Sequence, residues 1–410
     1  MSKTPRLSCV TFPVLPYDVG IEKAMEEIAD IGFHHVMFCC GIYTGYRLVM
    51  PRNPVRPIYA LEEGLQYHRP DEAHYGSIKP RYTSDFGDRD LLGEAVEHAR
   101  SRGMTVGAWL PFFANGRIAK AHPEAALQNL YGARDRLFLC YNNPDMLEFV
   151  RGMTRDVVEG YGVDAVEVDK IPQTLLELNA FAGRLDPIVR IIGSFCFCEH
   201  CEAKAKEFGA DLPAIRKHAR KLVEDSLRIP PHVINRLADE LQGDAEAPLL
   251  LLDEPMIHDL LRIRLETVRA FMEDLRRRVR KMRAGTRVYA TFVPPFKIGH
   301  DASAPRSWLC GQSYKNVAGV VDGINAVIHW ERDVVAYETR RAANAVAGRC
   351  ALDVHVPAYG RFAPDETPRL AEAALENGAD SVSFFCYDLM SEEMVEAVRA
   401  WIRAQKAGAK

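Results

Sequence analysis

Two acidic side chains alternate along one short apolar run and could carry out acid–base chemistry. The run reads Ala165-Val166-Glu167-Val168-Asp169, and side chains two residues apart in a strand share a face. A charged pair on the inner face of a sheet is costly unless it is paired or functional. We expect Asp169, nearer the end of the run, to act as nucleophile or base. Glu167 is a second catalytic candidate, or else the partner of a basic side chain.

A further carboxylate ends another apolar run, which reads His329-Trp330-Glu331-Arg332. The same alternation places His329 and Glu331 on one face. Hydrolysis of a glycosidic bond needs two carboxyl groups: one protonates the leaving oxygen, and the other attacks or activates water. We therefore predict that Glu331 is the acid/base partner of Asp169. The alternative is that Glu331 forms only a salt bridge.

Polar and aromatic side chains also stand near the ends of other apolar runs. Asp353 and His355 alternate along one run, and Tyr387 lies in the last. Sugar rings present apolar C–H faces that stack on aromatic rings, so such residues suit a carbohydrate groove. The residues predicted to bind substrate are Trp109, His329, Trp330, Asp353, His355 and Tyr387.

A group of three cysteines has the spacing of a metal site. Cys196, Cys198 and Cys201 form a CxCxxC motif, whose short spacing lets three thiolates converge on one ion. We expect Cys140 to supply the fourth tetrahedral ligand, with His200 as the alternative. Ligation by thiolates alone leaves no open position, so the predicted cofactor is a structural zinc. The competing interpretation is three unliganded thiols in a loop.

Eight short runs rich in β-branched or aromatic residues alternate with amphipathic helical patterns and must position these groups. Such alternation indicates a parallel sheet covered by helices, and eight units favour a closed barrel. We predict one α/β domain over residues 1–410, a (β/α)8 barrel of the TIM type. The runs cover residues 7–15, 34–42, 105–113, 165–171, 287–296, 323–332, 351–360 and 381–390.

Long insertions interrupt this rhythm after the second and fourth predicted strands. Residues 43–87 read as an ordered loop, and residues 172–286 read as a zinc-binding and helical insertion within the barrel. The second insertion carries the CxCxxC motif, followed by helical patterns over 212–241 and 255–282. Both follow the C-terminal ends of strands, where barrel enzymes build their active sites.

Composition favours a cytoplasmic protein that binds neither nucleic acid nor membrane. The 410 residues carry a net charge of −4, whereas nucleic-acid binding needs a basic surface. The one basic run, from Arg276 to Arg283, closes a predicted helix, where cations suit the helix dipole. Met1 to Val10 lacks the pattern of a signal peptide, and no apolar stretch is long enough to span a bilayer. A homo-oligomer in which residues 172–286 reach a neighbouring subunit is a further hypothesis.

A CxCxxC motif after the fourth strand, with a cysteine upstream, resembles the zinc cluster of glycoside hydrolase family 42 and of related uncharacterised glycoside hydrolases. The segments Leu139-Cys140-Tyr141-Asn142-Asn143-Pro144 and Tyr161 to Asp169 are similar to segments of the latter group. The resemblance covers residues 88–205 well and implies a glycosidase acting on a carbohydrate. Family 42 β-galactosidases carry an Asn-Glu pair at the end of strand four, where this chain reads Val168-Asp169-Lys170. Their mechanism and specificity therefore do not carry over.

Two other functions are compatible with the same residues. The first is a metal-dependent sugar isomerase, epimerase or lyase, because a hard divalent ion prefers oxygen and nitrogen ligands. Its ligands would come from Glu167, Asp169, His329, Glu331, Asp353 and His355. The second is a barrel that binds carbohydrate without catalysis.

Overall fold

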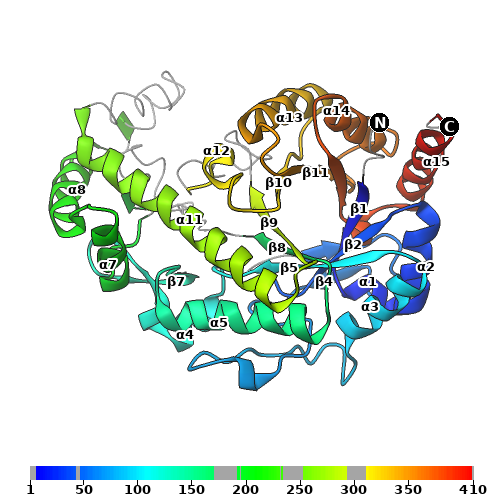
Figure 1. Ribbon diagram of the computed structural model, residues 1–410, viewed down its shortest axis with the longest axis horizontal. Helices are drawn as coiled ribbons and strands as arrows, with labels where there is room; N and C mark the ends of the chain where they lie inside the picture. Colours follow the sequence, from blue (N-terminus) through cyan, green and yellow to red (C-terminus); the bar gives the residue numbers. More distant parts are fainter. Residues whose placement is uncertain are drawn as a thin grey trace.

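The computed structural model shows a closed barrel of eight parallel strands surrounded by helices (Figure 1). It describes residues 6–42, 47–169, 192–193, 195–230, 232–233, 253–292 and 311–408. Neighbouring strands follow the order of the chain, and the last strand pairs with the first. The predicted fold class is thereby confirmed. The barrel strands are β1 (Arg6–Thr11), β2 (His35–Cys39), β5 (Thr105–Pro111), β8 (Ala165–Asp169), β9 (Arg287–Phe292), β10 (Gly323–Val327), β11 (Ala351–Pro357) and β12 (Ser381–Phe385).

Each predicted run contains one barrel strand, but the strands end earlier than the runs. β10 ends at Val327, whereas the alternation of apolar and polar residues predicts a strand to residue 332. After β1 the chain turns at Pro13 into the short helix α1 (Val14–Val19). Proline fixes its own φ and has no N–H to donate, so it suits the start of a helix better than a strand.

Amphipathic helices cover the outside of the barrel and alternate with its strands, as the sequence pattern predicts. In α2 (Ile21–Ile31), Ile21, Met25 and Ile28 are buried, as expected of apolar residues spaced by three or four. Gly32 ends α2 with φ 111°, and its N–H donates to the carbonyl of Ala29. Such a conformation costs little only for glycine. The other outer helices are α3 (Leu91–Ser101), α5 (Pro144–Arg155), α13 (Arg332–Val346), α14 (Glu366–Glu376) and α15 (Glu392–Gly408).

The inner face of the barrel is unusually polar. Glu167 pairs in register with Trp109 on β5 and with Tyr289 on β9. Val166 and Val168 take the opposite face of β8 and are fully buried, because helices cover the outside of the barrel. The alternation predicted from the sequence for this strand is confirmed, and it places Glu167 inside the barrel.

One contact inside the barrel can be tested by a small substitution. The ring of Tyr289 lies directly over Gly323, and a Cβ built on Gly323 would approach the ring to 2.1 Å. Gly323→Ala should therefore lower the free energy of unfolding by about 1–3 kcal/mol, the usual cost of overpacking. Urea denaturation would measure this loss. Gly285→Ala is the control, since nothing lies within 4 Å of its added Cβ, and equal stability of the two variants would contradict the prediction.

The predicted insertions contain ordered structure where they are described. The first holds the antiparallel pair β3 (Arg47–Val49) and β4 (Ile58–Ala60). The second holds α7 (Glu199–Glu207), α8 (Leu212–Ser226) and the long helix α11 (Pro255–Met282). The helix predicted over 212–241 is confirmed only as α8, because residues 234–252 lie outside the described residues. Among the described helices, none has the length and apolar composition needed to cross a membrane.

A third excursion, after β5, was not predicted. It contains α4 (Gly116–Ala121) and the antiparallel pair β6 (Ala126–Gln128) and β7 (Arg134–Leu139). β7 ends at Leu139, directly before Cys140, so this excursion brings Cys140 toward the second insertion. Its strands are short, and polar residues interrupt them, so no clear strand pattern is visible in the amino-acid sequence there.

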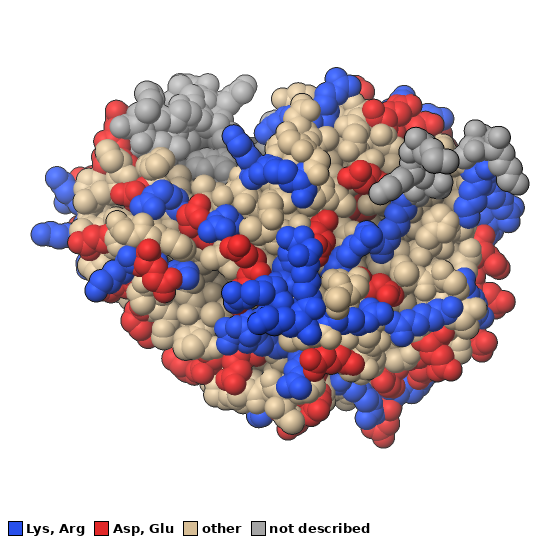
Figure 2. Space-filling model, viewed as in Figure 1, with Lys and Arg blue, Asp and Glu red and all other residues tan. Residues whose placement is uncertain are grey.

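The basic run at the end of α11 lies on the surface, where Figure 2 shows Lys and Arg side chains gathered over this part of the helix. Arg276 and Arg280 both contact Asp322, at 2.8 and 2.9 Å. Arg278 contacts Asp274 at 2.6 Å. Cations outnumber their acidic partners here, so this end of α11 carries excess positive charge.

Candidate active site and metal centre

Glu167 is completely buried inside the barrel. The hydroxyl of Thr291, on β9, donates a hydrogen bond of 2.7 Å to its Oε1 atom. Burial raises the pKa of Glu167 above its ordinary value, although His355 and Thr291 oppose this effect. A carboxyl group in such surroundings keeps its proton to a higher pH than one in water.

His355, on β11, lies between two buried carboxyl groups. Its Nε2 atom is 3.6 Å from Oε1 of Glu167 and 3.3 Å from Oδ2 of Asp353. Burial alone would lower the pKa of His355, but the charges of Glu167 and Asp353 outweigh it and raise the pKa to about 8. The imidazole is therefore charged at neutral pH.

Asp353 is held by two serine hydroxyls as well as by His355. Ser381 donates to one carboxylate oxygen at 2.5 Å and Ser383 to the other at 2.7 Å. Burial raises the pKa of Asp353, but the neighbouring imidazole of His355 and the hydrogen bonds from the two serines outweigh it and keep the pKa below its ordinary value. Asp353 and His355 thus form a buried ion pair.

Asp169 is the last residue of β8 and is half-buried. It lies one layer above Glu167 on the inner face, nearer the C-terminal mouth of the barrel, as the sequence predicted. Its negative charge is close enough to His355 to help raise the pKa of that imidazole. The structure therefore brings together four predicted site residues: Glu167, Asp169, Asp353 and His355.

Aromatic rings line the mouth beside this group. The imidazole of His329 lies 5.4 Å from the ring of Phe385 and 5.7 Å from that of Tyr359, measured between centroids. Burial, together with the charges of His355 and Arg361, lowers the pKa of His329 to about 3. His329 is therefore neutral and able to form hydrogen bonds. Tyr359 and Phe385 are half-buried, which leaves part of each ring exposed.

Glu331 lies apart from the buried carboxyl groups. Its side chain is 65% exposed, and Oε1 is 3.5 Å from Arg361. The expectation that His329 and Glu331 share one strand face is wrong, because β10 ends at Val327 and Glu331 is the first residue before α13. Trp330 is half-buried, with Arg361 lying 5.6 Å from its ring centroid.

Two other predicted substrate-binding residues do not lie at the mouth: Tyr387 is turned away from it, and Trp109 is deeply buried. The hydroxyl of Tyr387 donates to Glu27 on α2, and Arg52 lies over its ring. The side chain of Tyr387 therefore sits between the barrel and its outer helices. Trp109 is buried inside the barrel at the level of Glu167.

The hydroxyls of Thr291, Ser381 and Ser383 were missed by the sequence reasoning. They share the inner face with the acidic groups, since Asp353 pairs with Ser381 and His355 with Ser383 in register. The alternation Ser381-Val382-Ser383-Phe384 in the last run was the available signal. It predicts a polar inner face opposite an apolar outer one.

The four predicted cysteines form one buried cluster. The ligand atoms of Cys140, Cys196, Cys198 and Cys201 all lie within 4.8 Å of one another. The Sγ atom of Cys140 is 3.5 Å from that of Cys198 and 3.6 Å from that of Cys201. Sulfur atoms bound tetrahedrally to zinc at about 2.3 Å lie about 3.8 Å apart, so the spacing fits a four-coordinate metal ion.

Polar groups around the cluster also suit thiolates. The backbone N–H of Gln128 points at Sγ of Cys196, and that of Asn142 points at Sγ of Cys140, at 3.3 and 3.4 Å. Such donors stabilise negative sulfur. His200, the alternative fourth ligand, instead lies 3.6 Å from Glu199. Among the described residues, these cysteines are the one group of three or more potential ligands whose donor atoms converge.

No protein-family model matches the chain, and no curated protein matches it. Solved structures share its fold. The β-galactosidase from the Antarctic haloarchaeon Halorubrum lacusprofundi aligns with 98% of this chain at 13% identity and a TM-score of 0.58. A family 42 β-galactosidase from G. stearothermophilus aligns with 99% at 14% identity and a TM-score of 0.57. The catalytic domain of β-amylase from Paenibacillus polymyxa aligns with 98% at 10% identity and a TM-score of 0.54.

These alignments cover different shares of the other proteins. The chain spans 58% and 57% of the two β-galactosidases and 98% of the β-amylase domain. At such low identity the likeness shows the fold. It confirms the predicted structural resemblance to family 42, whose barrel this chain shares.

Proposed function

We propose that the protein is a glycoside hydrolase whose substrate binds at the C-terminal mouth of the barrel. The observation that carries this proposal is the position of Asp169 at the end of β8, above the buried group of Glu167, His355 and Asp353. Active sites of TIM barrels lie at this end of the strands. The likeness to solved glycosidases supports the same reaction class.

The two working carboxyl groups in this proposal are Asp169 and Glu331. Asp169, which lies near enough to His355 to affect its pKa, serves as nucleophile or base. The proposed acid/base partner is Glu331, which lies exposed at the rim next to Arg361 and would have to take up a proton before passing it to the leaving oxygen. Glu167 lies beneath Asp169 and helps to hold His355 in place, since its Oε1 atom is 3.6 Å from Nε2 of that imidazole.

The aromatic side chains at the mouth would hold the sugar. Tyr359 and Phe385 offer partly exposed rings against which the C–H face of a sugar can pack. His329, held between them, can form a hydrogen bond with a sugar hydroxyl through its Nε2 atom, which is buried and has no partner among the described residues. This arrangement favours a carbohydrate over a purely charged substrate.

The direct test is hydrolysis of a panel of aryl glycosides and oligosaccharides by the purified protein. The double variant Asp169→Asn/Glu331→Gln serves as the blank, since the amides keep the shape of the side chains. We expect release of reducing sugar from at least one substrate and none above background from the double variant. Equal rates for both proteins would end the proposal, and binding without turnover would favour a non-catalytic barrel.

The cysteine cluster is proposed to hold a structural zinc. Cys140, Cys196, Cys198 and Cys201 would fill all four tetrahedral positions and leave none for substrate or water. The ion would tie the excursion after β5 to the insertion after β8, because Cys140 comes from the first and the other three from the second. It would supply stability rather than chemistry.

The ion pair of His355 predicts that stability depends on pH. In the unfolded chain a histidine has a pKa of about 6.5, whereas in the folded protein that of His355 is about 8. A raised pKa stabilises the folded state fully below pH 6.5, and the contribution disappears as the pH rises through 8. We expect a loss of about 2 kcal/mol between pH 6.5 and 9.

Urea denaturation of the wild type and of His355→Gln across this range would measure the effect. The groups that face His355 are Asp353, Glu167, Asp169 and His329, and all four remain in the variant. The stability difference between the two proteins should therefore shrink as the pH rises. A difference that stays constant from pH 6 to 9 would show that His355 is not charged in the folded protein.

A further inference from the structure

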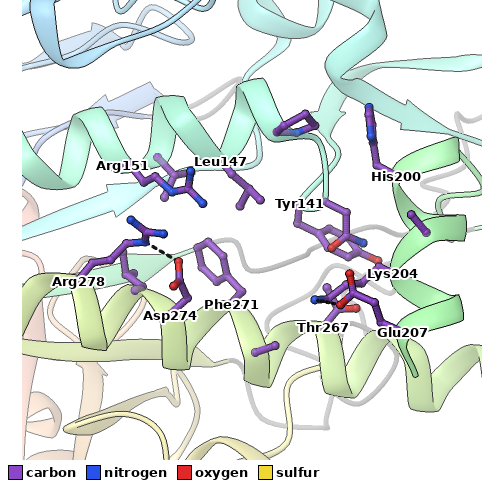
Figure 3. A pocket seen from close by; sticks show the side chains of 16 residues that line it. Tyr141, Leu147, Arg151, His200, Lys204, Glu207, Thr267, Phe271, Asp274 and Arg278 are labelled. Atoms are coloured by element: carbon purple, nitrogen blue, oxygen red, sulfur yellow. Dashed lines mark hydrogen bonds and ion pairs between the residues drawn. The ribbon is translucent and has the colours of Figure 1, made fainter. Parts of the chain in front are cut away.

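A groove of about 410 Å³ lies outside the barrel mouth, between α5, α7 and α11 (Figure 3). The loop that carries Tyr141 and Asn142 closes one end of it, next to the cysteine cluster. Its volume lies in the range of small-molecule sites, which is about 300–1,000 Å³. We propose that this groove binds an acidic carbohydrate, with a sugar ring on Phe271 and a carboxylate at Arg151 and Arg278.

The middle of the groove is apolar and presents one aromatic ring. Figure 3 shows Leu147 on α5 opposite Phe271 on α11. Phe271 is half-buried, and its ring is supported from behind by Phe113, at 5.3 Å between centroids, and by Phe112, at 6.4 Å. A ring fixed in this way offers a platform for the C–H face of a sugar without further ordering of the side chain.

Hydroxyl and amide groups line the end near the cysteines, together with His200 and the ion pair of Lys204 with Glu207. Thr267 is 3% exposed, and its Oγ1 atom has no hydrogen-bond partner within the part of the chain that the structure describes. A buried hydroxyl normally finds a partner, so a ligand hydroxyl at this place would satisfy it. Tyr141 and Asn142 line the same end. These groups favour a ligand with several hydroxyls over a hydrocarbon chain.

The opposite end of the groove is positively charged. Arg151 on α5 and Arg278 on α11 lie on either side of the gap (Figure 3). Arg278 shares Asp274 with Arg277, so the acidic charge there is already divided between two cations. Arg151 is exposed and forms no ion pair with any described residue. The basic side chains at the end of α11 (Figure 2) add to the attraction for an anion.

The arrangement therefore matches a ligand with an anionic end, a flat ring and several hydroxyls, which is the chemistry of a uronic acid in an oligosaccharide. An arginine side chain can bind a carboxylate through two parallel hydrogen bonds. The groove lies outside the barrel, so binding here does not depend on hydrolysis at the mouth. A failure of the proposed glycosidase activity would leave this inference standing.

Isothermal titration calorimetry of the full chain carrying Asp169→Asn, which should slow any turnover at the mouth, would test the site with three probes: trigalacturonate, neutral galactotriose and inorganic phosphate. We expect trigalacturonate to bind at least about tenfold more tightly than either of the others, because only it offers ring and carboxylate together. Adding Arg151→Gln should weaken trigalacturonate about tenfold and leave galactotriose unchanged. Arg155→Gln, one turn further along α5 and paired with Glu159, is the matched control and should have no effect.

Each other outcome overturns part of the assignment. Equal affinity for the neutral and acidic trisaccharides would remove the role of the two arginines. Phosphate binding as tightly as trigalacturonate would reduce the groove to an anion site without a sugar platform. Absence of binding at millimolar trigalacturonate, or equal weakening by Arg151→Gln and Arg155→Gln, would overturn the proposal as a whole.

Discussion

Asp169→Asn should lower kcat/KM for glycoside hydrolysis by a factor of about 10²–10⁴, the usual contribution of a positioned acid, base or nucleophile. The amide keeps the size of the carboxylate but cannot attack an anomeric carbon or take a proton from water. It also removes a negative charge beside His355, whose pKa that charge helps to raise. The effect should therefore appear in kcat and should be accompanied by a shift of the pH profile toward acid.

Steady-state kinetics on the best substrate of the wild type would measure this loss. Asp164→Asn is a matched control, because Asp164 lies immediately before β8 at the opposite end of the barrel and accepts a hydrogen bond from the backbone N–H of Val106. An asparagine can keep that bond through its side-chain oxygen and loses only the charge of the 3.4 Å ion pair with the half-exposed Arg283. We expect Asp164→Asn to retain activity within about threefold of wild type. Equal losses in the two variants would mean that Asp169 acts through folding rather than through chemistry.

Most of the barrel could be predicted because each strand has a strong local signal. β8 reads as valines alternating with acidic residues, and the structure places the valines outside and the acidic residues inside. The excursion after β5 gave no such signal, since its strands are held by pairing with each other rather than by an apolar face. The ends of the strands were predicted less well. β10 ends at Val327, because backbone hydrogen bonds, and not the types of the side chains, determine where a strand stops.

Part of the candidate site could likewise be predicted from the sequence, and part of it could not. The cysteine cluster was predictable because the CxCxxC spacing forces three sulfur atoms close together, and only Cys140 had to be placed by the fold. The meeting of Glu167, His355 and Asp353 depends on the register between strands that are far apart in sequence. The face on which Glu331 lies was predicted wrongly. Side chains alternate between two faces only within a strand, and β10 ends before this residue. Tyr387 follows β12 but turns toward Glu27, which no local pattern indicates.

Purified wild-type protein should contain about one zinc ion per chain, and Cys198→Ser should reduce this to less than about a tenth. Cys198 is fully buried among the other three sulfur atoms. A serine there offers a poor ligand for zinc and leaves three crowded thiols without a shared ion. Inductively coupled plasma mass spectrometry on protein purified without added metal would measure the content. Cys350→Ser is the control, since Cys350 is half-buried and lies outside the cluster.

Loss of the ion should loosen the segments that the cluster joins, and not the barrel. The backbone N–H groups of Gln128 and Asn142 point at Cys196 and Cys140, so their protection from hydrogen exchange reports directly on the thiolates. We expect these two amides to exchange at least about tenfold faster in Cys198→Ser or after chelation. The amides of β8 and β11, which are bonded within the barrel, should change little. Full protection of Gln128 and Asn142 in metal-free protein would show that packing alone holds the cluster together, and the zinc would then have no structural role.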